Sequence, residues 1–126
     1  YDIDAARAGT FAQGSGSTVM HSEDEVINSS DVVYICTWTS EHQRLVDMCI
    51  AAGKPFFCEK PLSTGFAKAR EMYDSATASG LTHQCGLILR RSPAYLWARE
   101  LIAEPAVTTR LDVKANWTKI FTAATL

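Results

Sequence analysis

Three short runs of strand length recur along this chain, and their spacing constrains the fold more than any other feature. They cover residues 31–36, 55–58 and 81–86, and the first two are apolar. The first is rich in β-branched and aromatic residues, which is typical of a strand covered on both faces. Amphipathic segments over 41–52 and 65–79 separate the runs. This alternation predicts a parallel sheet wound by helical crossovers, an α/β fold of the Rossmann type.

Capping residues predict where the remaining elements begin and end. Asp4 and the Gly14-Ser15-Gly16 triplet predict a helix over 5–13, and a brief strand is expected at 18–20. Ser22 and Glu25 form a capping box that predicts a short helix to about residue 29. Gly53 and Gly80 end the two amphipathic helices. Ser92-Pro93 starts a further helix to about residue 103, and residues 107–117 have strand-like alternation.

Composition limits the class of protein. The 126 residues carry 12 Lys and Arg against 14 Asp and Glu, a net charge of -2, with no basic block that could neutralise a nucleic acid. No apolar stretch approaches the roughly 20 residues of a membrane helix. We therefore expect a cytoplasmic protein with no nucleic-acid or membrane partner. The four cysteines lack CxxC spacing, so we expect buried reduced thiols.

Polar residues follow the predicted strands at the point where each one ends. Lys60 comes after the run 55–58, residues 37–42 follow the run 31–36, and Arg90 follows the third run. Asp2 stands at the start of the chain, after what looks like the end of another strand. Ligands bind at the carboxyl ends of parallel strands, so these residues predict a ligand crevice with Lys60 as its most reactive group.

Four sequence strings, taken together, resemble the Gfo/Idh/MocA family of nicotinamide-dependent oxidoreductases, which act mostly on sugars, inositols and related polyols. The strings are Thr37-Trp38-Thr39-Ser40-Glu41-His42, Ala51-Ala52-Gly53-Lys54-Pro55, Glu59-Lys60-Pro61 and Gly86-Leu87-Ile88-Leu89-Arg90-Arg91-Ser92-Pro93. The resemblance covers roughly residues 1 to 104. It implies a partial dinucleotide-binding domain over 1–90, then a linking helix and the start of an α+β substrate and oligomerisation domain over 91–126.

The family's glycine motif for the cofactor pyrophosphate, G-x-G-x-x-G, is absent from this sequence. Gly14-Ser15-Gly16 follows a predicted helix instead of a strand and cannot replace it. The resemblance therefore implies that about 30 residues of the usual unit lie upstream. On this interpretation the sequence is a fragment that is inactive alone, and the full-length protein is a homo-oligomer.

The resemblance assigns cofactor contacts to Asp2 and to residues of the 37–42 segment. Asp2 matches the acid that accepts the ribose hydroxyls, which implies NAD over NADP because a carboxylate repels a 2'-phosphate. A solvated loop acid or helix cap, shared with Asp4, is the alternative. Thr37 and His42 match the turn that cradles the cofactor near its nicotinamide, and Trp38, also expected to contact the cofactor, stands where the family has proline. His42 has an alternative reading as a helix-start histidine bonded to backbone.

The resemblance implies that Lys60, placed by Glu59 and Pro61, reaches both the nicotinamide ribose and the substrate hydroxyl. An ammonium there stabilises a developing alkoxide and can exchange a proton. Arg90 matches an arginine near the substrate or the nicotinamide amide. The function implied is hydride transfer between NAD and the hydroxyl or carbonyl carbon of a sugar, inositol or related polyol. For Lys60 the alternative is a surface lysine in a proline turn. For the function it is a non-catalytic ligand-binding or regulatory protein of the same fold.

One other constellation competes for the same edge of the sheet. Cys36, Cys58, His83 and Cys85 could converge there, and thiolates with imidazole form a zinc-type ligand set. Buried cysteine is also common and inert inside parallel sheets. We expect no metal.

Overall fold

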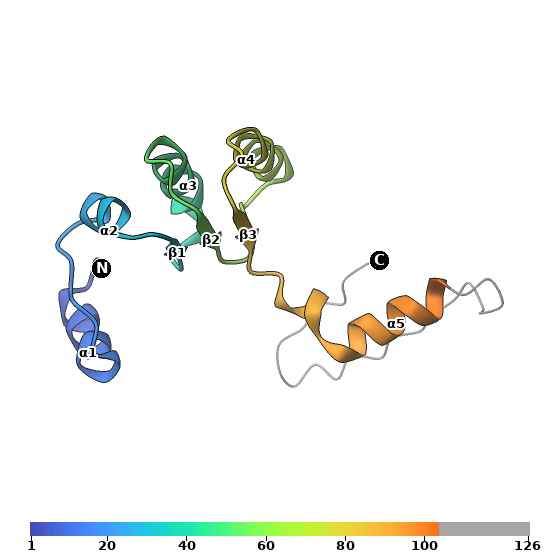
Figure 1. The fold of residues 1–126 in the computed structure, drawn as a ribbon, viewed down its shortest axis with the longest axis horizontal. Helices are drawn as coiled ribbons and strands as arrows, with labels where there is room; N and C mark the ends of the chain where they lie inside the picture. The colour runs from blue at the N-terminus through green and yellow to red at the C-terminus, as the bar shows by residue number, and fades with distance from the viewer. Residues whose placement is uncertain (104–126) are drawn as a thin grey trace. The chain divides into compact units, whose positions relative to one another are not determined.

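The computed structural model describes residues 1–103, which divide into two compact units at Leu87 and Ile88. The elements of the first unit, in chain order, are α1 (Ala5–Ser15), α2 (Glu23–Ser29), β1 (Val33–Ile35), the 3-10 helix η1 (Thr39–Glu41), α3 (His42–Ala51), β2 (Phe56–Cys58), α4 (Phe66–Ala78) and β3 (His83–Cys85). The second unit contains the 3-10 helix η2 (Ile88–Arg91) and α5 (Pro93–Ala103) (Figure 1).

The three strands form one parallel sheet in the order β1-β2-β3. The register places Ile35 beside Cys58, and Cys58 beside Cys85. Helix α3 connects the first two strands and α4 connects the second to the third. The predicted α/β fold with a parallel sheet is therefore confirmed, and each strand is shorter than the run of residues that predicted it.

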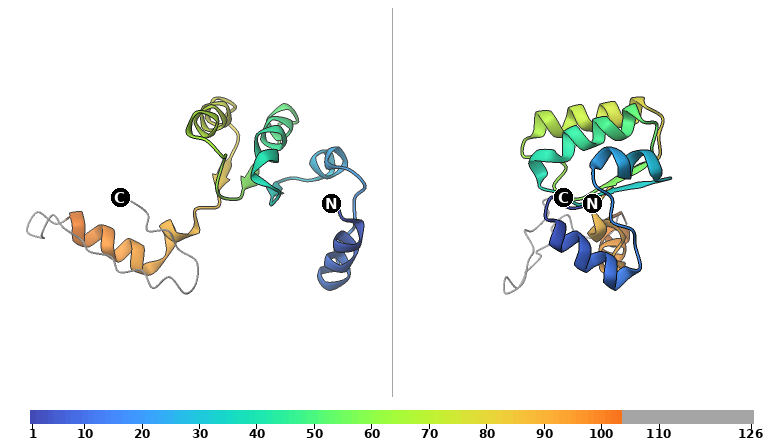
Figure 2. Two further views of the ribbon diagram at one scale, coloured as in Figure 1. Left: turned by 180° about the vertical axis from the view of Figure 1, so that it is seen from behind. Right: turned by 90° about the vertical axis from the view of Figure 1, so that its left-hand side faces the viewer.

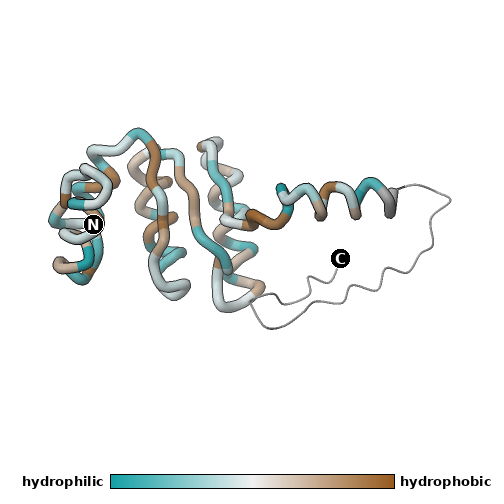
Figure 3. The backbone as a smooth tube through the Cα atoms, turned by 90° about the horizontal axis from the view of Figure 1, so that it is seen from below, coloured by the Kyte–Doolittle hydropathy of each residue, from teal (hydrophilic) through white to brown (hydrophobic). Residues whose placement is uncertain are grey.

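Helices α3 and α4 lie side by side over one face of the sheet (Figure 2). The buried side chains of the strands and of α3 join in one apolar cluster, and Figure 3 shows hydrophobic positions along these segments. Residues 33, 35 and 56 face it from the sheet because side chains alternate along a strand. The fully or nearly buried members are Ile27, Val33, Ile35, Leu45, Val46, Cys49, Phe56, Cys58, Met72 and Ala76.

The expected burial of the first strand on both faces is wrong for the described residues. Tyr34 points away from α3 and is 69% exposed. Its ring contacts the half-buried ring of Phe57, with centroids 5.3 Å apart, and Gln84 beside them is exposed. An unbroken apolar run does not state how many faces are covered, because an apolar residue can also occupy the more open face.

The strand expected at residues 18–20 is also not formed, since these residues have no regular secondary structure. A strand exists only through hydrogen bonds to a neighbour. In the described residues β1 pairs with β2 alone. The β-forming residues at 18–20 therefore have no described partner strand.

The predicted helix starts at Asp4 and Ser92 are confirmed, whereas the first helix ends two residues later than predicted. The Asp4 carboxylate accepts hydrogen bonds from the amides of Ala6 and Arg7 at the start of α1. This helix runs on to Ser15 and ends at Gly16, whose φ of 68° suits a residue without a side chain. Ser92 accepts from the Tyr95 amide at the start of α5. The predicted strand at 107–117 lies outside the described residues.

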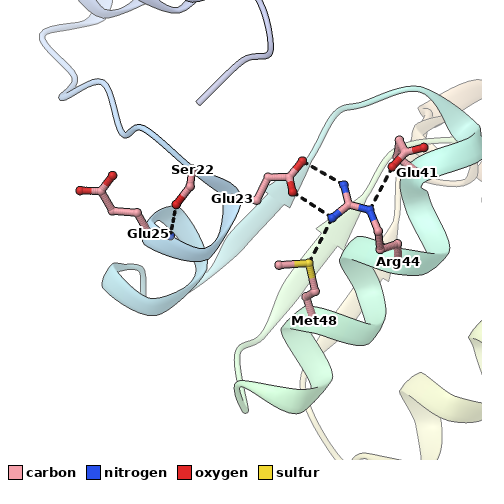
Figure 4. A network of polar contacts seen from close by, with 6 residues as sticks. All are labelled: Ser22, Glu23, Glu25, Glu41, Arg44 and Met48. Carbon is pink, nitrogen blue, oxygen red and sulfur yellow. Dashed lines mark hydrogen bonds and ion pairs between the residues drawn. The ribbon is translucent and has the colours of Figure 1, made fainter.

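Helix α2 is joined to the start of α3 by Arg44 (Figure 4). The guanidinium donates to both oxygens of Glu23 at 2.9 Å, and to Glu41 at 3.0 Å. Ser22 caps α2 by accepting from the Glu25 amide, as the capping box predicts. The Glu25 carboxylate, however, accepts from the His21 amide one residue before the cap. Arg44 lowers the pKa of Glu23 through these hydrogen bonds.

The side chain of Lys54 is hydrogen-bonded to the carboxyl end of α2. Its ammonium donates to the carbonyl oxygens of Asn28 and Ser30 at 3.3 and 2.9 Å. Cations stabilise the carbonyl end of a helix, where the backbone acceptors have no partner of their own. Both ends of this two-turn helix are therefore bonded to distant residues, the first to α3 and the last to the segment between α3 and β2. No described helix is long and apolar enough to cross a membrane.

We expect Glu23→Gln to reduce the free energy of unfolding by about 0.5–1 kcal/mol near pH 7, a figure discounted because both side chains are partly exposed. The folded-state pKa of Glu23 is lowered, so its contribution is complete above the unfolded pKa and is lost as pH falls through the folded value. Urea denaturation across pH should show the two proteins converging in acid. Asp74→Asn, which breaks an exposed pair within α4, should have a smaller effect. A difference that stays constant with pH would contradict the assignment.

Candidate functional site

The turns that follow the three strands are held together at the carboxyl edge of the sheet. Two backbone hydrogen bonds continue the ladder beyond the strand ends. The Glu59 amide donates to the Ile35 carbonyl at 3.0 Å, and the Gly86 amide donates to the Cys58 carbonyl at 2.8 Å. The segments starting at 36, 59 and 86 therefore leave the sheet side by side, as the prediction of a crevice at this edge requires.

Lys60 leaves this edge from the middle strand, and its residue is exposed. Its backbone amide donates to the carboxylate of Glu59 at 2.8 Å. The peptide bond between Lys60 and Pro61 is cis. A flexible ammonium is thus carried on a backbone segment whose direction is set by hydrogen bonds on both sides of the strand end.

The Glu59 carboxylate lies against Gly86, the first residue beyond β3. A Cβ atom at position 86 would lie 2.8 Å from the Glu59 Oε2 atom and 3.1 Å from the Phe57 ring. Real Cβ atoms essentially never approach other atoms as closely as 2.8 Å. Glycine at 86 therefore leaves the space in which the Glu59 side chain folds back onto the Lys60 amide.

His42 opens α3 and is only 1% exposed. Its Nδ1 atom lies 3.1 Å from the Pro61 carbonyl oxygen and 3.3 Å from that of Leu62. Its Nε2 atom lies 3.3 Å from the Thr37 carbonyl oxygen. The side chain thus joins the turn after β1 to the segment after β2. This is the backbone-bonded histidine considered as the alternative from sequence, and a contact of His42 with a cofactor stays a prediction.

The remaining predicted residues occupy different parts of the chain. The Thr37 hydroxyl donates weakly to the Trp38 carbonyl at 3.4 Å, and the Trp38 ring is 78% exposed beside it. Asp2 lies before α1, where its carboxylate accepts from the Asp4 amide at 2.9 Å. Arg90 is exposed on η2 and belongs to the second unit. The structure therefore brings together the residues at 37–42 and 59–62.

The four cysteines differ in burial: Cys49 and Cys58 are buried, Cys85 is partly buried and Cys36 is exposed. Burial raises the pKa of the Cys49 thiol to about 11, and burial with neighbouring thiols raises that of Cys58 to about 12. Buried reduced thiols were expected, and these two confirm it. The expectation is wrong for Cys36, which is exposed because it lies one residue beyond β1. Within residues 1–103 no three His, Cys, Asp or Glu side chains are arranged to hold a metal ion.

One recess in the surface lies along α3 and the start of α4 and reaches the turn after β1 at Ser40. It is wide open and is lined by Ser40, Gln43, Arg44, Asp47, Met48, Ala51 and Lys68. It contains none of the residues predicted to bind a ligand. Two residues that shape the carboxyl edge, Gly86 and Leu62, had no role assigned from sequence. The position of Gly86 at the end of the third run is the only sequence signal that could have suggested it.

We expect Gly86→Ala to destabilise the protein by about 1 kcal/mol, at the low end of the usual cost of overpacking. The added methyl group displaces the Glu59 carboxylate, which is the far end of a flexible side chain, and presses on the Phe57 ring. Thermal unfolding measures the effect. Gly14→Ala is the comparison without a close contact, since its Cβ would meet nothing within 4 Å, and it should stabilise α1 slightly because alanine favours a helix more than glycine does. Combining Gly86→Ala with Glu59→Ala should recover part of the loss. A Gly86→Ala variant as stable as the unaltered protein would contradict the expected crowding of Glu59 and Phe57.

Comparison with known proteins gives consistent relatives. Inositol 2-dehydrogenase of Cereibacter sphaeroides ATCC 17023 is 37% identical over 100 residues, which are 79% of this chain and 30% of that protein. Trans-1,2-dihydrobenzene-1,2-diol dehydrogenase of Sus scrofa is 35% identical over 89 residues, 71% of this chain and 27% of that protein. The chain thus spans less than a third of the length of these relatives.

Solved structures agree. An NAD binding oxidoreductase from Klebsiella pneumoniae superposes with a TM-score of 0.71 at 32% identity, covering 81% of this chain and 28% of that one. A sequence model of the oxidoreductase family with an NAD-binding Rossmann fold matches residues 1–87, which include the whole described sheet and both bridged turns. The chain therefore belongs to the Gfo/Idh/MocA family of oxidoreductases.

Proposed function

We propose that the full-length gene product is an NAD-dependent oxidoreductase in which Lys60 assists proton transfer at a CH–OH carbon of a polyol. One observation carries the proposal: the exposed Lys60 leaves the carboxyl edge of the sheet between two neighbouring strand turns and is held there through Glu59 and the His42 bridge. This is the edge at which open α/β sheets bind nucleotide cofactors. The family match and the relatives support the same class of reaction.

Oxidation of an alcohol by hydride transfer requires a group that accepts the hydroxyl proton as the carbon is oxidised. An ammonium next to the hydroxyl stabilises negative charge on its oxygen, and the neutral amine can accept the proton. The Lys60 side chain is long and exposed enough to reach a substrate hydroxyl. The Glu59 carboxylate accepts a hydrogen bond from the backbone amide of Lys60. The ammonium formed in this way then passes the proton to water and returns to the amine, since the residue lies at the surface of the described unit.

The residues around this edge have suitable donors for NAD. The cofactor supplies the acceptor for the hydride when it is bound. The Thr37 hydroxyl and the exposed Trp38 ring would line its nicotinamide half, and the Lys60 ammonium would donate to a ribose hydroxyl. Asp2 would accept from the hydroxyls of the other ribose. Its present partner, the Asp4 amide, occupies only one of its oxygens.

The relatives suggest which alcohol is oxidised. One is named for inositol and another for a trans-1,2-dihydrobenzene-1,2-diol. Both names describe a six-membered carbon ring with hydroxyls on adjacent carbons. We therefore propose a cyclic vicinal diol or polyol as substrate. Substrate contact by Arg90, a homo-oligomeric state, a cytoplasmic location and a substrate domain beginning at residue 91 stay predictions.

Replacing Lys60 by Met should lower kcat by about two or more orders of magnitude in the full-length gene product, the scale expected for lost acid and base assistance. Initial rates of NADH formation with myo-inositol and with a ring diol test this. Lys68→Met, on an exposed position of α4, is the control and should leave kcat within about twofold. An unchanged kcat in Lys60→Met would remove the residue from the mechanism. NAD binding without turnover of any alcohol would favour the non-catalytic regulatory alternative.

The carboxylate of Asp2 should make kcat/KM higher with NAD than with NADP, because a 2'-phosphate would meet like charge. Asp2→Ser should narrow that gap by about tenfold or more, as expected when about 1.4 kcal/mol of repulsion is removed. Asp4→Ser is the matched control, since serine also caps helices and Asp4 is occupied by the α1 amides. Equal use of both cofactors by the unaltered protein would overturn the role of Asp2.

A further inference from the structure

We infer that His42 is a positioning residue that couples two segments. One is the cofactor turn, residues 37–41 after β1, which faces Nε2, and the other is the lysine segment, residues 59–63 after β2, which faces Nδ1. The inference rests on the proposed function for its kinetic consequences, while the coupling itself is a property of the fold. His42 is 1% exposed, so its ring is enclosed by protein in the described unit. It acts on the reaction through the backbone it holds.

The ring is surrounded by hydrogen-bond acceptors. Nδ1 faces the carbonyl oxygens of Pro61 and Leu62, and Nε2 faces that of Thr37. A carbonyl oxygen only accepts, so a ring nitrogen that forms a hydrogen bond here is its donor. A neutral imidazole has one N–H and can donate to one segment at a time, whereas the doubly protonated ring donates to both. The two segments therefore compete for, or share, the hydrogens of one side chain.

The contacts link parts of the chain that are far apart in sequence. Thr37 precedes His42 by 5 residues, whereas Pro61 and Leu62 follow it by 19 and 20. The carbonyls are those of the residues that leave β1 and β2, so the ring spans the two strand ends on the helix side. Displacement of one segment moves the acceptor away from the ring and thereby changes the hydrogen bond available to the other. Lys60 lies directly before Pro61, and Trp38 directly after Thr37.

Two conservative substitutions separate the two halves of this bridge. The amide nitrogen of asparagine can occupy the place of Nδ1, and that of glutamine the place of Nε2. His42→Asn thus keeps a donor toward Pro61 and Leu62 and loses the one toward Thr37. His42→Gln keeps the donor toward Thr37 and loses the other. In the full-length gene product we expect His42→Asn chiefly to raise KM for NAD, and His42→Gln chiefly to lower kcat, each by about tenfold, the effect of one hydrogen bond of about 1.4 kcal/mol.

Amide hydrogen exchange, followed by mass spectrometry, measures the coupling without any turnover. His42→Asn should accelerate exchange in residues 37–41 and spare 59–63, and His42→Gln should do the reverse. Leu45→Ala is the matched control: it is buried one turn further along α3, has only apolar contacts to lose, and should destabilise the unit without a preference for either segment. His42→Ala should accelerate exchange in both segments.

The opposite selectivity of Asn and Gln is the result that supports the inference. Equal effects of the two variants on both segments, no effect, or the pattern of Leu45→Ala would overturn it. Failure of the proposed function has a different signature, because an unaltered protein that neither binds NAD nor oxidises a ring diol would leave the exchange pattern intact. Exchange that follows the prediction while KM and kcat change together would confirm the bridge and overturn its division between cofactor and lysine.

Discussion

The candidate site depends on two backbone hydrogen bonds that extend the parallel ladder past the ends of the strands. They run from Glu59 to Ile35 and from Gly86 to Cys58, at 3.0 and 2.8 Å. Because parallel strands all end at the same edge, each extra bond carries the register of the buried sheet into the residues that leave it. The backbone from which the side chains of the candidate site extend is thus fixed relative to the sheet. Lys60 gains its direction in this way, one residue beyond the last bond.

Side chains complete what the ladder begins, and each does so through backbone groups of another segment. His42 satisfies carbonyls after β1 and β2, and Glu59 satisfies the amide of Lys60. Buried donors and acceptors without partners cost free energy, and no described buried side-chain nitrogen or oxygen lacks one. The same principle holds α2, where Arg44 and Lys54 tie a helix of two turns to the following elements. Polar contacts set positions here, while the apolar cluster under α3 and α4 supplies cohesion.

The two faces of the sheet differ in a way that affects the chemistry of its residues. On the face under α3 and α4, burial raises the pKa of Cys49 and Cys58 and keeps these thiols unreactive. On the other face Tyr34 is largely exposed and touches Phe57. The reactive groups of the candidate site lie on neither face. They lie at the edge, where a lysine can meet a ligand and still be anchored by a rigid backbone.

The sequence by itself determined the order of elements, the ends of the helices and the strand ends at which to look for a site. Asp4, Ser92 and the glycines at 53 and 80 act within a few residues of their own position, so their effects can be predicted locally. Lys60 and its neighbours were found because a short polar motif follows an apolar run. The strand expected at 18–20 failed because pairing needs a partner strand, which local sequence does not specify.

Only the tertiary structure decided what lies against what. The space that Gly86 leaves for Glu59, the exposure of Tyr34 and Cys36, and the bridge from His42 to Pro61 and Leu62 all join residues from different elements. Sequence patterns report the environment of one element at a time, because hydrophobic periodicity arises from a single helix or strand. Contacts between elements depend on the register of the sheet and on how the helices pack over it. For that reason the residue types of the candidate site were predictable, and the hydrogen bonds that position them were not.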